Sequence, residues 1–185
     1  RAEVGFGDDV LIFGAGPLGL LHLQLVNHAG AARVIICDLI EEKLELAREL
    51  GAADTVNVEK RNTDTLKEIA PYGFDMVIDA TGVAQVVEDA VSFVKNTGKL
   101  MFFGVCPQDF SIEVNPYEVY RRDLELIGVF ALNKTLGESI KLIDNGVINT
   151  EKLISDVMPL QDLGKALNML KNGKAGGKIQ IEPWR

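Results

Sequence analysis

The feature that most constrains this chain is a glycine turn between an apolar run and a helical pattern. Residues 10–13 are apolar, residues 14–19 read GAGPLG, and a helical pattern continues to residue 29. In a strand–turn–helix unit, the first glycine permits a tight turn, the second leaves space for a diphosphate, and the third lets the helix approach the strand. The positive end of the helix then faces the phosphates. The pattern predicts a dinucleotide-binding turn.

The expected pyrophosphate contacts are the residues of this turn. They are Gly14, Gly16, Pro17, Leu18 and Gly19. Pro17 suits the first turn of a helix but has no N–H, so Leu18 is the expected backbone donor.

An acidic residue stands where such a fold recognises a ribose. Asp38 ends the second predicted strand, 19 residues beyond Gly19. A carboxylate in this place accepts hydrogen bonds from both hydroxyls of an adenosine ribose and repels a 2′-phosphate. The sequence therefore predicts NAD, and not NADP, as the cofactor. The alternative is that the glycines only form a turn and that Asp38 only caps the helix starting at Glu41.

Short β-branched runs alternate with helical patterns, which is typical of a parallel sheet flanked by helices. Strands are expected at residues 10–13, 33–37, 55–58, 74–78, 99–103 and 124–130. Helices are expected at residues 17–29, 41–50, 64–70, 83–95 and 116–122. Six strands predict an α/β fold with a doubly wound parallel sheet of the Rossmann type.

The pattern changes after Phe130. A helix is expected near residues 135–145, a short stretch at 153–157, a helix near 160–171 and a strand at 178–181. We place a boundary near Leu132, which gives an NAD-binding domain over residues 1–132 and a small C-terminal α/β appendage over residues 133–185. About 50 residues with few apolar positions form a thin core, so we expect the appendage to pack against something else.

Charge and cysteine content exclude several classes of protein. The chain has 19 Lys and Arg against 27 Asp and Glu, a net charge of −8, which disfavours nucleic acid or an anionic membrane as partner. No signal peptide is apparent, and the apolar runs end well before the roughly 20 residues of a membrane span. Cys37 and Cys106 lie in apolar runs, as reduced thiols of a cytoplasmic protein do.

The sequence offers no metal-binding or hydrolytic set of residues. His22 and His28 are six residues apart on a predicted helix and point about 120° away from each other. Neither cysteine has a second cysteine at zinc-ligand spacing, and the serines lack a nucleophile-elbow context. We expect no catalytic and no metal-binding residue in these 185 residues.

Taken together, the motifs resemble the medium-chain zinc-dependent alcohol and polyol dehydrogenases. The resemblance rests on residues 7–19, 30–35, Asp38, 43–47, 50–52, DATG at 79–82, GKL at 98–100, FGV at 103–105 and GKI at 177–179. The GPLG form of the turn is most similar to the sorbitol and threonine dehydrogenase branch.

The resemblance implies further contacts with the cofactor. Lys43 would join Asp38 at the adenosine ribose; Thr81 and Gly82 would bound the adenine side or the adjoining ribose; Phe103, Val105 and Val129 would contact the nicotinamide; and Lys178 would bind the phosphates. Alternatively, Phe103 and Val129 are core residues and Lys178 is a solvated strand end.

In this family the zinc ligands and the proton-relay residues belong to an N-terminal catalytic domain, whereas only 13 residues precede Gly14 here. The resemblance implies that this chain is the cofactor-binding portion of a longer oxidoreductase and is inactive alone. In the parent, a hydride would pass from a secondary alcohol or polyol to NAD, with zinc as Lewis acid. The alternatives are a non-catalytic NAD-sensing module and an S-adenosylmethionine-dependent methyltransferase.

The predicted strand at residues 124–130 would lie at the edge of the sheet. An apolar edge strand offers backbone groups for pairing with another strand. In the family that the chain resembles, dimers join this region of two subunits into one sheet, so we expect a homodimer with contacts centred on residues 110–130. Alternatively, residues 133–145 or 111–114 cover the edge within one chain.

Overall fold

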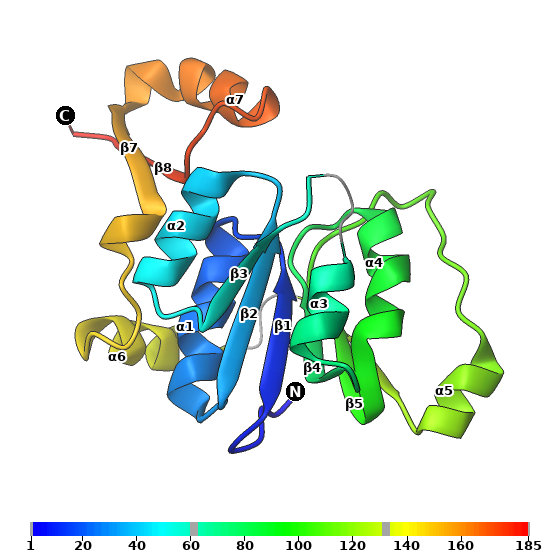
Figure 1. The fold of residues 1–185 in the computed structure, drawn as a ribbon. Helices are drawn as coiled ribbons and strands as arrows, with labels where there is room; N and C mark the ends of the chain where they lie inside the picture. Colours follow the sequence, from blue (N-terminus) through cyan, green and yellow to red (C-terminus); the bar gives the residue numbers. More distant parts are fainter. Residues whose placement is uncertain (1, 60–62, 131–133, 185) are drawn as a thin grey trace.

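A computed structural model describes residues 2–59, 63–130 and 134–184. The main sheet has six parallel strands in the order β3-β2-β1-β4-β5-β6, with helices on both faces (Figure 1). Its strands are β1 (Asp9–Phe13), β2 (Arg33–Asp38), β3 (Asp54–Asn57), β4 (Phe74–Asp79), β5 (Val94–Phe102) and β6 (Glu125–Gly128). The helices among them are α1 (Pro17–Ala29), α2 (Glu41–Glu49), α3 (Asp64–Ile69), α4 (Ala84–Ala90) and α5 (Pro116–Arg122). The predicted doubly wound sheet is confirmed.

The sheet is covered by apolar side chains on both faces. Along β1, Val10 and Ile12 belong to one buried cluster, with residues of α1 and α2, while Leu11 and Phe13 belong to a second cluster, with residues of α3. Strands that are buried on both faces read as continuous apolar runs, which is why the central strands stand out in the sequence.

The boundaries of α4 and β5 differ from the expected helix at 83–95 and strand at 99–103. Helix α4 ends at Ala90, a 3-10 turn (Val91–Phe93) follows, and β5 already begins at Val94. Val94 pairs with Phe74 of β4, and the register then shifts before Lys99 pairs with Met76. Pairing with β4 therefore outweighs the helical pattern after Phe93.

Other expected strands and helices shift by smaller amounts. The predicted strand 55–58 lies one residue earlier, at Asp54–Asn57. The predicted strand 124–130 is shorter, because β6 covers only Glu125–Gly128, although it is the last strand of the sheet as expected. The predicted helix 160–171 divides into a 3-10 turn (Leu160–Asp162) and α7 (Leu163–Lys171).

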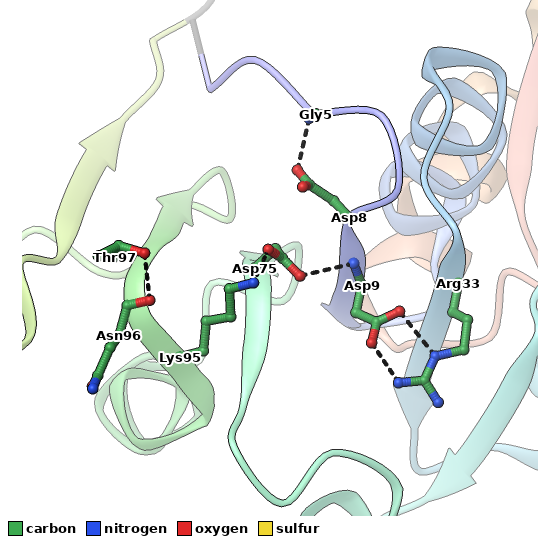
Figure 2. Close-up of polar contacts among 8 residues, drawn as sticks. All are labelled: Gly5, Asp8, Asp9, Arg33, Asp75, Lys95, Asn96 and Thr97. Carbon is green, nitrogen blue, oxygen red and sulfur yellow. Dashed lines mark hydrogen bonds and ion pairs between the residues drawn. The ribbon is translucent and has the colours of Figure 1, made fainter.

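A polar network holds the amino end of the sheet together (Figure 2). Arg33 Nε donates to Asp9 Oδ1 at 2.9 Å, and the Asp9 N–H donates to Asp75 Oδ2 at 3.1 Å. Lys95 forms an ion pair with the same Asp75 carboxylate. The network connects β2, β1, β4 and β5 at the end of the sheet opposite the glycine turn, so it aligns the strands without entering the region of the turn.

The C-terminal segment forms the predicted small α/β appendage. It contains α6 (Leu136–Asp144), a 3-10 turn (Glu151–Leu153), β7 (Ile154–Pro159), α7 and β8 (Lys178–Glu182). Strands β7 and β8 pair in parallel as a separate sheet. The expected stretch 153–157 thus lies in the 3-10 turn and β7. The boundary expected at Leu132 lies within residues 131–133, outside the described residues.

The appendage contacts the α1–α2 side of the main sheet (Figure 1). The Asn149 N–H donates to the buried Gln24 side chain of α1 at 2.7 Å, and Lys152 pairs with Glu49 of α2 at 2.7 Å. Leu153 is buried in the cluster that contains α1. These contacts bring the chain around residue 153 close to the start of α1.

Several apolar side chains of the appendage stay exposed. They are Leu136, Ile140 and Ile143 on α6, and Leu163, Leu167 and Leu170 on α7. Across the described ranges, every helix is too short or too polar to traverse a membrane.

Candidate cofactor-binding site

The glycine turn leaves β1 in a backbone conformation that favours glycine. Gly14 has φ +99°, and its N–H donates to the Cys37 carbonyl oxygen of β2 at 2.7 Å. A Cβ on Gly14 would also lie 3.0 Å from the side chain of Thr81. Gly14 therefore makes the turn and leaves room for the loop that follows β4.

Gly19 and Gly16 have different roles in the turn. A Cβ on Gly19 would lie 1.8 Å from the Gly14 carbonyl oxygen, so α1 can pack onto β1 only with glycine at this position. A Cβ on Gly16 would meet no described atom within 4 Å. Gly16 precedes Pro17 at the start of α1, with extended backbone. Packing within the fold does not require a glycine at this position. A ligand that approaches the start of the helix would require one, because a side chain here would occupy its space.

Asp38 connects the turn to the end of β2. Its Oδ2 accepts the Ala15 N–H at 2.8 Å, and its Oδ1 accepts the N–H groups of Leu39 and Ile40 at 2.8 and 3.0 Å. Helix α2 begins at Glu41 without a side-chain cap, so Asp38 does not cap that helix. A carboxylate has about four acceptor positions, which leaves capacity for a ribose hydroxyl.

A buried carboxylate organises the loop after β4. Asp79 accepts hydrogen bonds from the Thr81 N–H at 2.9 Å, from the Thr81 hydroxyl at 2.6 Å and from the Gly82 N–H at 3.3 Å. Gly82 has φ +67°, and a Cβ there would lie 2.5 Å from the Val105 carbonyl oxygen. Three residues predicted separately, Thr81, Gly82 and Val105, are thus brought together.

A cavity of about 400 Å³ lies at the carboxyl ends of β1 and β2, beside the loop after β4. Its boundary includes the predicted residues Gly14, Asp38 and Thr81. The apolar part of the lining consists of Phe13, Cys37, Leu39, Val58, Val83, Val86 and Phe93. In the sheet, β1 lies between β2 and β4, so the cavity opens where the strand order reverses. Open α/β sheets bind ligands at this switch point, in cavities of about 300–1,000 Å³.

A smaller hollow of about 40 Å³ lies at the start of α1. Ala15, Pro17 and Lys43 line it on one side, and Lys152 with Gly177 of the appendage on the other. Lys43 at the positive end of a helix favours an anion, whereas Lys152 is paired with Glu49 at 2.7 Å. Lys178, predicted to bind phosphate, is exposed at the first position of β8, directly after Gly177.

The residues predicted to contact the nicotinamide lie apart from the large cavity. Phe103 and Val129 are partly buried against the cluster that contains α1, and the ring of His22 meets Phe103 edge-on at 4.4 Å between centroids. Val105 is 91% exposed. Phe103 and Val129 therefore contribute to the core, whatever else they contact.

Burial favours the neutral forms of two ionisable side chains outside the turn, His22 and Cys37. Burial lowers the pKa of His22 to about 4 and raises the pKa of the Cys37 thiol. Burial first, and then Asp79, raises the pKa of Cys106; both cysteines are free. In the described part of the chain, no three His, Cys, Asp or Glu residues are grouped so that they could hold a metal ion. These residues do not fit a zinc ion.

Sequence reasoning missed two parts of this region. Gln85, Asp89 and Phe93 line the cavity, and their spacing of four residues on a predicted helix is a signal that places them on one face. The contact of Lys152 and Gly177 with the start of α1 had no local signal, because it depends on how the appendage folds back.

Strand order, glycine turn and cavity together define a dinucleotide-binding Rossmann fold. The family described as zinc-binding dehydrogenase matches residues 17–145. This chain therefore belongs to the zinc-binding dehydrogenase family, which confirms the resemblance found in the sequence. Membership contradicts the methyltransferase alternative.

Individual relatives show the same class. The chain is 35% identical to D-altritol 5-dehydrogenase of Agrobacterium fabrum over 94% of its length, and 31% identical to L-threonine 3-dehydrogenase of Coxiella burnetii over 94%. It covers 50% and 51% of these relatives, about half their length. Among solved structures, a zinc-binding dehydrogenase of Sinorhizobium meliloti, described as bound to NADP, superposes with a TM-score of 0.88 at 28% identity, over 97% of this chain and 53% of that one.

Proposed function

We propose that this chain is the NAD-binding portion of an oxidoreductase that transfers a hydride from a secondary alcohol or polyol to NAD. The observation that carries the proposal is the hydrogen bond of 2.8 Å between Asp38 and the glycine turn, at the mouth of the cavity at the switch point. This bond supports the proposal because it joins the residue proposed to bind the ribose to the turn proposed to bind the phosphates.

In the proposed complex, the pyrophosphate lies on the backbone of Gly14, Gly16, Pro17, Leu18 and Gly19. The open space at Gly16 supports this position, because the first N–H groups of a helix have no partner within the helix. Lys43 and Lys178 would add positive charge near the phosphates and ribose, on the side where Lys43 lines the smaller hollow.

The two halves of the cofactor would then extend in different directions from the turn. The adenosine ribose would bind Asp38, and the adenine would enter the cavity beside Thr81 and Gly82. The nicotinamide would lie toward Phe103, Val105 and Val129. The contact between Gly82 and Val105 supports this arrangement, since it joins the two loops on which these residues lie.

NAD is proposed in preference to NADP, although the Sinorhizobium meliloti protein is described as bound to NADP. The Asp38 carboxylate points at the turn and would repel a 2′-phosphate on the ribose that it binds.

We propose that the remaining functions belong to parts of the protein outside this sequence. The relatives are about twice as long as the matched region, and the described residues do not fit zinc. Residues 1–132 would be the NAD-binding domain and residues 133–185 the appendage, whose exposed apolar side chains on α6 and α7 would pack against the rest. The chain alone would bind NAD and oxidise no alcohol.

We further propose a cytoplasmic homodimer joined at β6. The two free cysteines suit a reducing compartment, and β6 is the last strand of the sheet, with Leu126 at its surface.

Calorimetric titration of the chain with NAD tests the central proposal, with Gly16→Val as the variant. We expect the wild type to bind NAD and the variant to stay folded but lose binding, because a Cβ at this position meets no described atom within 4 Å and would occupy the space proposed for the pyrophosphate. Absence of NAD binding to the folded wild type would refute the proposal. Hydride transfer from an alcohol in the full-length protein would separate a dehydrogenase from an NAD-sensing module.

A further inference from the structure

One wall of the large cavity has polar groups that the proposed ribose and phosphate contacts do not use. Gln85, Asp89 and Phe93 lie four residues apart along α4 and the 3-10 turn after it, and all three line the cavity. Residues four apart lie on one face of a helix, so this wall consists of two polar side chains and an aromatic ring.

The two polar side chains are oriented by each other. Gln85 Nε2 donates to Asp89 Oδ1 at 3.2 Å. This bond uses one of the two N–H groups of the Gln85 amide, which leaves Asp89 Oδ2 and Gln85 Oε1 as acceptors and the second amide N–H as a donor. Within the described ranges, neither of these two oxygens has a hydrogen-bond partner. The wall therefore offers hydrogen-bond acceptors to a ligand that carries a donor.

The topology places this wall across the cavity from Asp38. Asp38 ends β2, α4 follows β4, and β1 separates the two strands in the sheet. A nucleoside whose ribose is bound by Asp38 would extend its base over the end of β1, between the apolar side chains of Leu39 and Val86, with its far edge toward α4.

We propose that Asp89, oriented by Gln85, recognises the exocyclic amino group of the adenine and thereby selects a 6-aminopurine over a 6-oxopurine. The inference rests on the proposed function, because it assumes that the cavity takes the adenosine half of NAD. It adds a specificity-determining residue to that site.

The physical reason is the match of donors and acceptors. The adenine amino group donates a hydrogen bond to a carboxylate, whereas the oxygen of hypoxanthine at the same position is an acceptor. Two acceptors that face each other without a proton leave both unpaired, and sites built for an N–H donor reject analogues that lack it.

Asp89 is assigned this role in preference to Glu59, which together with Asp38 and Asp89 supplies the carboxylates of the cavity lining. Asp89 lies on a helix, and its position is fixed by Gln85, whereas among the described residues the Glu59 carboxylate has no side-chain partner. A ligand-selecting group must be held in place before the ligand binds.

The test is calorimetric titration of the chain with NAD and with nicotinamide hypoxanthine dinucleotide, which has a 6-oxo group and an N1–H where adenine has a 6-amino group and an unprotonated N1. We expect NAD to bind about tenfold more tightly, the effect of about 1.4 kcal/mol. Asp89→Asn is expected to remove or reverse this preference, because the new amide donates to the 6-oxo group. Gln85→Leu is expected to reduce the preference without changing the melting temperature by more than a degree or two, since Gln85 is exposed.

The control is Glu88→Gln, which removes one charge from the same helix outside the cavity lining and should keep the tenfold preference. Equal binding of the two dinucleotides to the wild type would overturn the inference and leave the proposed function intact. A preference that survives in Asp89→Asn but disappears in Glu59→Gln would also overturn it. Binding of neither dinucleotide to the folded wild type would refute the proposed function itself, and with it the inference.

Discussion

The Asp38 carboxylate accepts a hydrogen bond of 2.8 Å from the backbone N–H of Ala15, in the middle of the glycine turn. The residue proposed to bind the ribose thus also holds the turn proposed to bind the phosphates. A substitution at Asp38 therefore acts on both halves of the adenosine diphosphate site, and its effects must be read as the sum of a lost ligand contact and a loosened turn.

Asp38→Ala is expected to weaken NAD binding by about tenfold to a hundredfold, the effect of removing hydrogen bonds to a charged group worth about 1.5–3 kcal/mol. NADP binding should weaken less or improve, because the repulsion of the 2′-phosphate disappears while the turn loosens for both cofactors. Titration of the wild type and the variant with both cofactors measures the ratio of the dissociation constants for NAD and NADP. The control is Asp64→Ala, which removes an exposed carboxylate outside the cavity lining. A wild type with equal affinity for both cofactors would contradict the role of Asp38.

Gly19→Ala is expected to destabilise the chain by more than about 2 kcal/mol, because its Cβ would lie 1.8 Å from the Gly14 carbonyl oxygen and α1 would have to move. The control is Gly164→Ala, near the start of α7, where a Cβ meets no described atom within 4 Å. There the helix propensity of alanine should raise stability by up to about 1 kcal/mol. Urea unfolding of both variants measures the difference. Equal effects would contradict the packing role of Gly19.

The fold was predictable because its signals are local. The buried strands β1, β2 and β4 are continuous apolar runs, and the glycine turn defines how β1 connects to α1. The start of β5 was not predictable, since Val94 leaves the helical pattern to pair with Phe74, a contact between residues 20 positions apart. Sequence periodicity does not record such pairing.

The candidate site also combines residues that local sequence patterns predicted with residues that only the folded sheet brings together. The turn and Asp38 were identified from spacing along the chain, and the structure places them in one hydrogen-bonded unit. The wall formed by Gln85 and Asp89 was missed, because without the sheet order nothing relates α4 to β2. The buried role of Asp79 was also missed, although a charged residue that ends an apolar strand is itself a signal.

His22 is expected to make stability depend on pH. Burial lowers the pKa of His22 from 6.5 to about 4 in the folded chain, so the unfolded chain binds more protons between these values. The contribution of the neutral His22 to the free energy of unfolding is complete above pH 6.5 and is lost as the pH falls toward 4. By pH 5 the loss amounts to about 2 kcal/mol.

Urea unfolding at pH 7.5 and pH 5 measures this loss. His22→Leu keeps an apolar contact for Phe103. In this variant, the difference in the free energy of unfolding between pH 7.5 and pH 5 should be smaller by that amount than in the wild type. His28→Leu is the control, because it removes the other imidazole from an exposed position of α1. An identical pH dependence in the wild type and both variants would show that burial of His22 has no such effect.

The proposed dimer predicts a specific effect of a charge on β6. Ile127 packs against the core, so a lysine there would unfold the chain as well as block pairing, whereas Leu126 lies at the surface and tests association alone. In a symmetric dimer joined at β6, Leu126 would meet its partner chain near the twofold axis, and Leu126→Lys would place two like charges close together.

Sedimentation at tens of micromolar should therefore show a dimer for the wild type and a monomer for Leu126→Lys. Leu136→Lys, on the exposed face of α6, should remain a dimer. If the wild type sediments as a monomer, or if Leu126→Lys sediments as the wild-type dimer does, β6 is not the dimer interface.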